Sequence, residues 1–275
     1  MVAARATRHT LLPQRGVAQV TGLQTHSRPV TTASQRAGVR VMMQVMIARH
    51  QAGPDPSQSL CPMPLHYRTI PVTPFQQNAS LVWCEATRQA ALIDPGGELP
   101  RLLAAVEELG LELGQIWLTH AHIDHAGGTG ELARTRGLPI VGPHEADQFW
   151  IDALPQQSQM FGFPPAEAFS PTRWLVDGDQ VTLGDCTLDV RHCPGHTPGH
   201  VVFHSAQARR CFVGDVLFAG SIGRTDFPGG DFDTLIASIT QRLWPMGDDT
   251  VFIPGHGPES SFGRERRFNP YLQGS

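Results

Sequence analysis

Lysine is absent from this chain of 275 residues, so all 21 of its strongly basic side chains are arginines. We draw no mechanistic conclusion from that choice. Cysteine is scarce too: five residues are scattered along the chain, without the C-x-x-C spacing of many metal and redox motifs. The expected state is reduced thiols in a protein of the cytosolic type. Long apolar runs are also missing, because none reaches the roughly 18 residues that a membrane helix needs. The sequence therefore predicts a cytoplasmic protein without a membrane partner.

The charge is divided unevenly along the chain. Residues 1–62 hold seven arginines and a single acid, Asp55, whereas the remainder holds 14 arginines and 24 acids. An acidic region offers no broad positive surface to a phosphate backbone. Nucleic acid is therefore not an expected partner, which argues against a nuclease.

Residues 1–62 differ in composition from the rest of the chain. They are rich in Arg, Ser, Thr, Gln and Pro and show little periodic apolar pattern. One interpretation is a disordered extension, or a start codon placed too far upstream, with Met63 just before the first expected strand. The alternative is a transit peptide, which is also Arg-rich and poor in acids and would direct the protein to an organelle. On either interpretation, residues 63–275 form the catalytic domain.

Regular patterns begin at residue 66, where short apolar runs alternate with turns rich in Gly, Pro and Asn. The runs predict strands over residues 66–72, 79–85, 90–93, 115–118, 139–141, 180–183, 186–191, 200–204, 210–213 and 250–253. Helical spacing predicts helices over residues 99–109, 130–136, 145–154 and 232–243. This order suits an α/β (α+β) fold in which two mixed sheets pack face to face, with helices on the outer faces.

The segment Thr-His-Ala-His-Ile-Asp-His-Ala-Gly-Gly, residues 119–128, is the most informative part of the sequence. In an extended segment, residues i and i+2 point to the same side, so His120 and His122 can converge on one ion. Asp124 and His125 then lie where the chain turns into a helix and can face a second ion. A set of imidazoles and carboxylates without thiolates is typical of catalytic metal sites.

Three further side chains of types that commonly bind metal ions follow other short β runs, each beside Gly or Pro. They are His196 in Pro-Gly-His-Thr, Asp215 in Val-Gly-Asp and His256 in Pro-Gly-His-Gly. Loops at the ends of strands are where catalytic residues concentrate on a rigid scaffold. The sequence therefore predicts a catalytic metal site assembled from four separate segments.

The pattern H-x-H-x-D-H, followed by H, D and H, resembles the metallo-β-lactamase superfamily. The likeness is greatest to its short hydrolase branch related to type II glyoxalases (hydroxyacylglutathione hydrolases). It runs from about Tyr67 to Leu272 and includes Asp94-Pro-Gly-Gly and Gly223-Arg-Thr-Asp-Phe. The resemblance implies the αββα sandwich of that superfamily.

The resemblance also implies a site for two divalent metal ions, with zinc expected and iron or manganese as alternatives. One ion would be held by His120, His122 and His196, the other by Asp124, His125 and His256, with Asp215 bridging them. The implied reaction is hydrolysis of a thioester such as S-lactoylglutathione, by attack of a hydroxide shared between the ions. Asp124 would orient this nucleophile and accept its proton. The implied partner is a small-molecule thioester.

Arg224 is the expected substrate contact, because a guanidinium can grip a glutathione carboxylate with two hydrogen bonds. An ion pair with Asp226 or Asp231 is the alternative. Asp94 is expected to orient a ligand imidazole or to be an ordinary turn residue, and His200 to support the loop of His196. Aromatic and methionine side chains are expected to pack rather than to bind ligand. They are Trp150, Met160, Phe161 and Phe163.

The chain departs from full-length type II glyoxalases after His256, where too few residues remain for their C-terminal helical domain. A glutathione pocket must therefore be built differently, with Arg264, Arg266 and Arg267 as candidate contacts. Persulfide dioxygenases, which use one iron, share the Gly-Arg-Thr-Asp-Phe segment and are the alternative class. Hydrolysis of another ester, a lactone or a β-lactam is the third.

Overall fold

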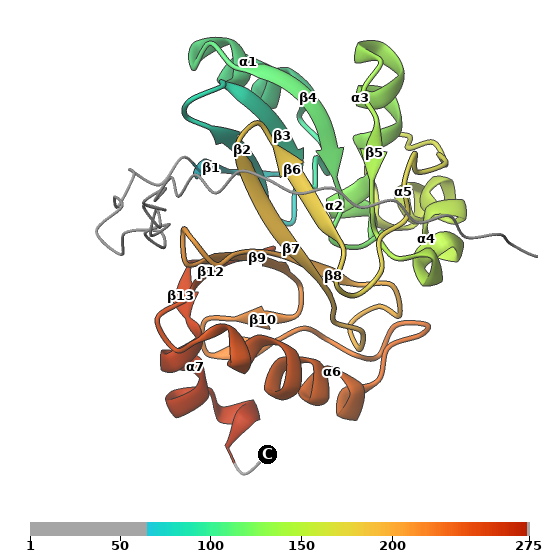
Figure 1. Cartoon of the computed structure of the whole chain (residues 1–275). Helices are drawn as coiled ribbons and strands as arrows, with labels where there is room; N and C mark the ends of the chain where they lie inside the picture. The colour runs from blue at the N-terminus through green and yellow to red at the C-terminus, as the bar shows by residue number, and fades with distance from the viewer. Residues whose placement is uncertain (1–64, 274–275) are drawn as a thin grey trace, which may run out of the picture. The chain divides into compact units, whose positions relative to one another are not determined.

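The computed structural model describes residues 65–273. The expectation for residues 1–62 lies outside the described residues. The described part contains two large mixed sheets with helices on their outer faces (Figure 1). The prediction of a two-sheet sandwich is therefore confirmed. Among residues 65–273, no helix is both long and apolar enough to cross a membrane.

The first sheet has the strand order β1-β2-β3-β4-β5. Its members are β1 (Leu65–Val72), β2 (Gln77–Cys84), β3 (Gln89–Ile93), β4 (Glu112–Trp117) and β5 (Ile140–Val141). The first three strands pair antiparallel, whereas β3, β4 and β5 are parallel. Parallel strands need long crossovers. These contain α1 (Leu99–Glu108) between β3 and β4, and α2 (Ile123–Ala126) with α3 (Thr129–Arg136) between β4 and β5. The loops after β3 and β4 therefore leave the same edge of the sheet.

The second sheet has the order β13-β12-β9-β8-β7-β6. Its members are β6 (Gln180–Leu183), β7 (Cys186–His192), β8 (Val201–Ser205), β9 (Arg210–Gly214), β12 (Val251–Pro254) and β13 (Ser260–Ser261). Only the pair of β9 and β12 is parallel within this sheet. The small pair β10 (Leu217–Phe218) and β11 (Ser221–Ile222) follows β9, and α6 (Phe232–Ser238) and α7 (Phe262–Phe268) complete the second half.

The core has three apolar layers because successive strand residues face opposite sides of a sheet. In β2, Leu81 faces the layer under α1, and Val82 faces the second sheet. The central layer between the sheets includes Trp117 and Phe203, whose rings lie 5.4 Å apart. A third layer joins the second sheet to α6 and α7. The two sheets are thus fixed relative to each other, which holds the loops at their shared edge in place.

The helical prediction for residues 145–154 is wrong in its bounds. That region forms a 3₁₀ turn (Glu145–Asp147), α4 (Gln148–Asp152) and α5 (Leu154–Phe161). Pro155 lies in the first turn of α5, where proline begins a helix without losing a hydrogen bond. The predicted helix over 232–243 is α6 followed by a π-helical turn (Ile239–Leu243). α5 matters for function because it reaches the candidate site.

Candidate metal centre

The loop between β4 and α2 carries the first part of the site. His120 and His122 lie in this loop, and Asp124 and His125 lie in the first turn of α2. The loop after β3 packs directly on α2, since a Cβ atom on Gly96 would lie only 1.5 Å from the carbonyl oxygen of Asp124. Only glycine allows this approach. The Asp-Pro-Gly-Gly turn therefore packs against the segment that carries Asp124 and His125.

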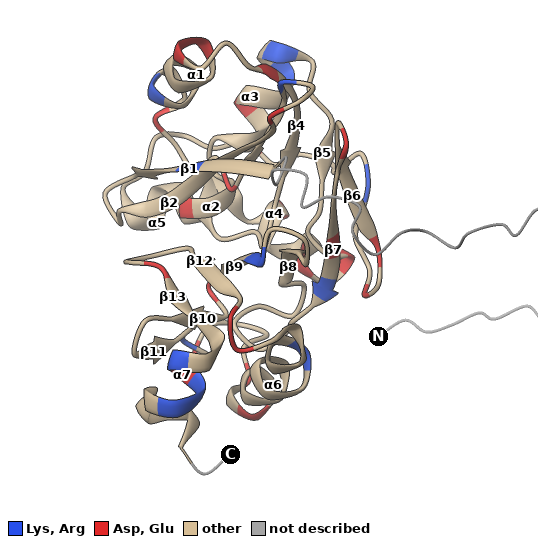
Figure 2. Ribbon diagram, turned by 60° about the vertical axis from the view of Figure 1, so that its left-hand side comes forward, with Lys and Arg blue, Asp and Glu red and all other residues tan. Residues whose placement is uncertain are grey.

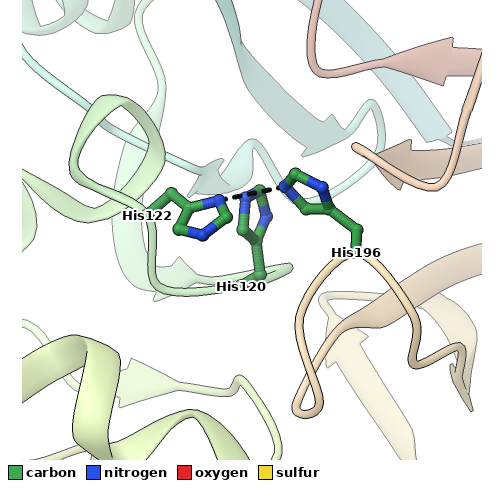
Figure 3. Close-up of side chains that lie close together, drawn as sticks. All are labelled: His120, His122 and His196. Atoms are coloured by element: carbon green, nitrogen blue, oxygen red, sulfur yellow. Dashed lines mark hydrogen bonds between the residues drawn. The ribbon is translucent and has the colours of Figure 1, made fainter. Parts of the chain in front are cut away.

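His120, His122 and His196 converge at one point, although His196 comes from the loop between β7 and β8 (Figure 3). All three side chains are buried, and one ligand atom of each lies within 4.8 Å of the others. Nε2 of His196 is 2.9 Å from Nδ1 of His122. Nδ1 of His196 donates to the carbonyl oxygen of Arg224 at 2.8 Å. That hydrogen bond leaves Nε2 of His196 free to act as a ligand.

A second group beside the first contains Asp124, His125 and His256. Oδ2 of Asp124 is 3.1 Å from Nε2 of His256. Asp215 reaches both groups: its Oδ2 is 3.5 Å from Nε2 of His196 and 3.6 Å from Nε2 of His256. The seven predicted ligand side chains are thus brought together, with Asp215 between the two groups.

Several buried polar atoms at this centre have no hydrogen-bond partner among the described residues. They are Nε2 of His120, His122 and His125, and Oδ1 of Asp215. Native proteins rarely leave buried polar atoms unpaired, so such atoms require an explanation. At the centre itself, Nδ1 of His122 faces Nε2 of His196, and imidazole and carboxylate groups gathered in this way suit a cation. The residues present therefore fit divalent metal ions.

The electrostatics of the centre favour cation binding. Burial, together with neighbouring histidines, holds the pKa of His120 and of His122 well below the usual value, so both rings are neutral and can offer a lone pair to a metal ion. Burial opposes protonation of His125 as well, but the carboxylates of Asp215 and Asp124 raise the pKa of that ring. Burial likewise acts against ionisation of Asp215, yet His125 and the other rings lower its pKa. The centre thus attracts positive charge, which bound metal ions would supply.

Asp94 and His200 contact the candidate ligands from outside the two groups. Asp94 accepts hydrogen bonds from the backbone N–H and the hydroxyl of Thr119, and its Oδ2 is 2.9 Å from Nδ1 of His125. The expected contact with a ligand imidazole is therefore present. His200 stacks on His120 and accepts the backbone N–H of Asp215 at 3.1 Å. It supports the loop of Asp215 rather than only that of His196.

Sequence reasoning missed Asp147 and Gln157. Asp147 is buried and accepts hydrogen bonds from the backbone of Ala121, the hydroxyl of Thr197 and the backbone of Gly199. It ties the loop of His120 and His122 to the loop of His196. Gln157 accepts the backbone N–H of Ile123 and donates to the carbonyl of Trp150. Neither residue lies in a motif, because its partners are distant in sequence.

A cavity of ≈ 550 Å³ opens above the centre. It is lined by Phe75, His122, Ile123, Asp124, Trp150, Gln157, Phe161, His196, Asp215, Phe218, Ser221, Ile222, Arg224, Phe227 and His256. The expectation that the aromatic and methionine side chains only pack is partly wrong. Phe163 is buried, and Trp150 is buried but also lines the cavity. Phe161 is exposed at the cavity, and Met160 projects into solvent.

Arg224 lies at the cavity and forms a two-pronged ion pair with Asp226, with distances of 2.7 and 2.6 Å. Its guanidinium also lies 4.0 Å over the ring of Phe227. The ion pair with Asp226 is therefore present, whereas Asp231 caps α6 through Thr234. The arginines of α7, where basic positions gather in Figure 2, do not line this cavity. Among the described residues that line the cavity, Arg224 alone carries a permanent positive charge.

The sequence matches the family model of the metallo-β-lactamase superfamily over residues 72–256. Hydroxyacylglutathione hydrolase GloC of Haemophilus influenzae is 47% identical over 209 residues, with 76% of this chain and 98% of that protein covered. The mitochondrial persulfide dioxygenase ETHE1 of Homo sapiens is 34% identical, with 68% of this chain and 67% of that protein covered.

Solved structures agree with this relationship. The B3 metallo-β-lactamase BLEG-1 superposes with a TM-score of 0.71 at 36% identity, and the match covers 76% of this chain and all of that one. TTHA1623 in a di-iron-bound form gives a TM-score of 0.67 at 36% identity, covering 74% and 100%. The chain belongs to the metallo-β-lactamase superfamily. The predictions of its fold and of a metallo-hydrolase are confirmed at the level of the family.

Proposed function

We propose that the protein is a metal-dependent thioester hydrolase that acts on small hydroxyacylglutathione substrates such as S-lactoylglutathione. The observation that carries the proposal is the convergence of seven His and Asp side chains, with unpaired buried nitrogens, at the floor of a ≈ 550 Å³ cavity. The 47% identity to a hydroxyacylglutathione hydrolase supports the substrate class.

We propose two metal positions, one held by His120, His122 and His196 and one by Asp124, His125 and His256, with Asp215 contacting both. The arrangement of two adjoining groups supports this division. Zinc suits the nitrogen and oxygen ligands, and iron is the alternative because the similar TTHA1623 has a di-iron form. Bound there, the ions supply Lewis acidity and lower the pKa of water towards about 7.

The protein's own side chains would then orient the reactants. We propose that Asp124 orients the attacking water and accepts its proton; its carboxylate lies beside His256, with Oδ2 3.1 Å from Nε2 of that ring. The apolar side chains around the cavity exclude bulk water from the thioester carbonyl. Arg224 would bind a glutathione carboxylate by exchanging its partner Asp226. That exchange costs little, because both side chains are more than half exposed and such ion pairs are weak.

Persulfide oxidation is the second candidate, supported by the 34% identity to a persulfide dioxygenase. Such an enzyme needs one iron, whereas this chain has a complete second group of candidate ligands in Asp124, His125 and His256. The second group favours hydrolysis.

The test is turnover by the purified, metal-loaded full chain. Loss of the S-lactoylglutathione thioester is followed by absorbance, and oxygen uptake is followed separately with glutathione persulfide. We expect thioester hydrolysis without oxygen uptake. His122→Ala should abolish it, and Arg224→Ala should raise KM about tenfold with kcat retained, as expected when uniform binding is lost. Oxygen uptake without hydrolysis, or full activity of His122→Ala, would overturn the proposal.

A further inference from the structure

Three phenylalanines from separate segments line the cavity: Phe75 and Phe161 are in contact with each other, and Phe218 lies beside His256. Phe75 lies in the turn between β1 and β2, Phe161 is the last residue of α5, and Phe218 ends β10. Phe75 is 46% exposed and Phe161 is 38% exposed. Exposed aromatic surface is unfavourable in water, so rings gathered around a cavity indicate a binding surface for an apolar group.

The three rings are held in place by contacts with neighbouring aromatic rings. Phe75 packs edge-on against Phe161, with ring centroids 6.0 Å apart, and against the buried Phe163 at 5.1 Å. Phe218 lies edge-on to His256 at 6.1 Å. Edge-to-face contacts at these distances are favourable and fix the rings. A wall that is already ordered binds an apolar group without a further entropy cost for its own side chains.

The two ends of the cavity differ in charge, because Arg224 lies at one of them, beside Phe227 and Trp150. The carbonyl oxygen of Phe75 accepts a hydrogen bond from Nδ1 of His256, so the phenylalanine end adjoins the second ligand group. The carbonyl oxygen of Arg224 accepts a hydrogen bond from Nδ1 of His196, so the arginine end adjoins the first group. The thioester carbonyl must lie between these ends, above Asp215. The two halves of a substrate therefore face different surfaces.

We propose that Phe75, Phe161 and Phe218 form an acyl subsite that selects thioesters with a large apolar acyl group, such as an aryl group, over those with a small one. The inference rests on the proposed function, which assigns the anionic thiol half of the substrate to Arg224. The acyl half then faces the phenylalanines. A lactoyl group presents only a methyl to this apolar surface, whereas a mandeloyl group presents a whole phenyl ring.

The matched substrates are S-lactoylglutathione and S-mandeloylglutathione, in which phenyl replaces methyl and nothing else changes. A single methylene in a fitted apolar pocket changes kcat/KM by roughly 10–200-fold. We therefore expect the full-length, metal-loaded protein to show a kcat/KM at least about tenfold higher for the mandeloyl compound. Equal values, or a preference for lactoyl, would overturn the subsite.

The matched variants are Phe161→Ala and Phe232→Ala. Phe161 lines the cavity, whereas Phe232 at the start of α6 is 48% exposed and does not. We expect Phe161→Ala to lower kcat/KM for the mandeloyl compound about tenfold and for the lactoyl compound less than about threefold. Phe232→Ala should change neither. Equal losses for both substrates in Phe161→Ala would contradict the proposal.

A binding measurement separates this inference from catalysis. Calorimetry with the unreactive thioethers S-benzylglutathione and S-methylglutathione should show tighter binding of the benzyl compound, and the difference should shrink in Phe161→Ala. Equal affinities would count against the subsite. Wild-type protein that hydrolyses neither thioester refutes the proposed function, whereas hydrolysis with a preference for lactoyl refutes the subsite alone.

Discussion

Nδ1 of His125 lies 2.9 Å from Oδ2 of Asp94, and both side chains are buried. The carboxylate can only accept a hydrogen bond, so this contact assigns the ring proton to Nδ1 and leaves Nε2 facing Asp215 at 3.3 Å. Asp94 also accepts the backbone N–H of Thr119, the residue before His120. One carboxylate from the loop after β3 therefore contacts the segments that carry candidate ligands of both groups.

Asp94→Asn is expected to weaken metal binding. The amide removes the negative charge and places N–H groups where acceptors are needed, and loss of such a supporting carboxylate lowers metal affinity about 10–100-fold. Competition for zinc with a chromophoric chelator measures the change. Asp152→Asn on the exposed side of α4 is the control and should bind zinc as the wild type does. Equal affinities for Asp94→Asn and the control would contradict the assigned role.

Gly255→Ala should damage the centre by steric overlap alone. A Cβ atom at this position would lie 2.1 Å from Oδ1 of Asp215 and 2.6 Å from the His125 ring. We expect a loss of zinc affinity of at least about tenfold, because displaced ligands cannot keep their geometry. Gly114→Ala in β4, whose nearest neighbour would be 4.0 Å away, should retain wild-type affinity. The measurement is the same chelator competition, and normal zinc binding by Gly255→Ala would refute the prediction.

Asp147 should make stability depend on pH. Burial raises the pKa of this carboxyl from 3.8 to about 7, although three hydrogen bonds act in the opposite direction. Between these values the folded protein keeps a proton that the unfolded chain has released. The contribution of Asp147 to the free energy of unfolding therefore falls as the pH rises from about 4 to about 7, by at most about 1.4 kcal/mol per pH unit.

The check is denaturant unfolding of the wild type and Asp147→Asn across this pH range. All other groups titrate in both proteins, so the difference between the two curves isolates Asp147. We expect the wild type to lose stability relative to the variant as the pH rises, with no further change above about pH 8. Parallel curves would show that Asp147 is ionised throughout.

Metal removal should lower the free energy of unfolding. A ligand that binds only the folded state at about 1,000 times its Kd stabilises it by about 4 kcal/mol. We therefore expect zinc to raise the Tm of the metal-free protein by several degrees and a chelator to reverse the shift. The Tm of His120→Ala should rise much less when zinc is added. A rise equal to that of the wild type would mean that zinc binds elsewhere.

The places of three candidate ligands could be predicted from the sequence because each follows a short apolar run beside Gly or Pro, and their binding of metal stays a prediction. His196, Asp215 and His256 follow such runs, and the two-sheet fold was predictable from the same alternation. Asp147 was not predictable, because its role depends on two loops that meet only after both sheets have formed. The same holds for His200, whose acceptor nitrogen meets the backbone of Asp215 across 15 residues.

The helical segment before the cavity was the weakest prediction. Residues 145–154 have the apolar spacing of one helix, but α4 ends before Ala153 and a separate helix, α5, begins at Leu154. That break carries Gln157 and Phe161 to the cavity, where aromatic composition alone suggested only packing. Local pattern cannot distinguish an aromatic ring that fills a core from one that lines a cavity.

The most direct test of the account is the number of metal ions per folded chain. Elemental analysis of the zinc-loaded protein should give two ions per chain, falling to one in His256→Ala, which loses a ligand of the second group only. One ion in the wild type, unchanged in His256→Ala, would contradict a two-metal centre and the hydrolase built on it.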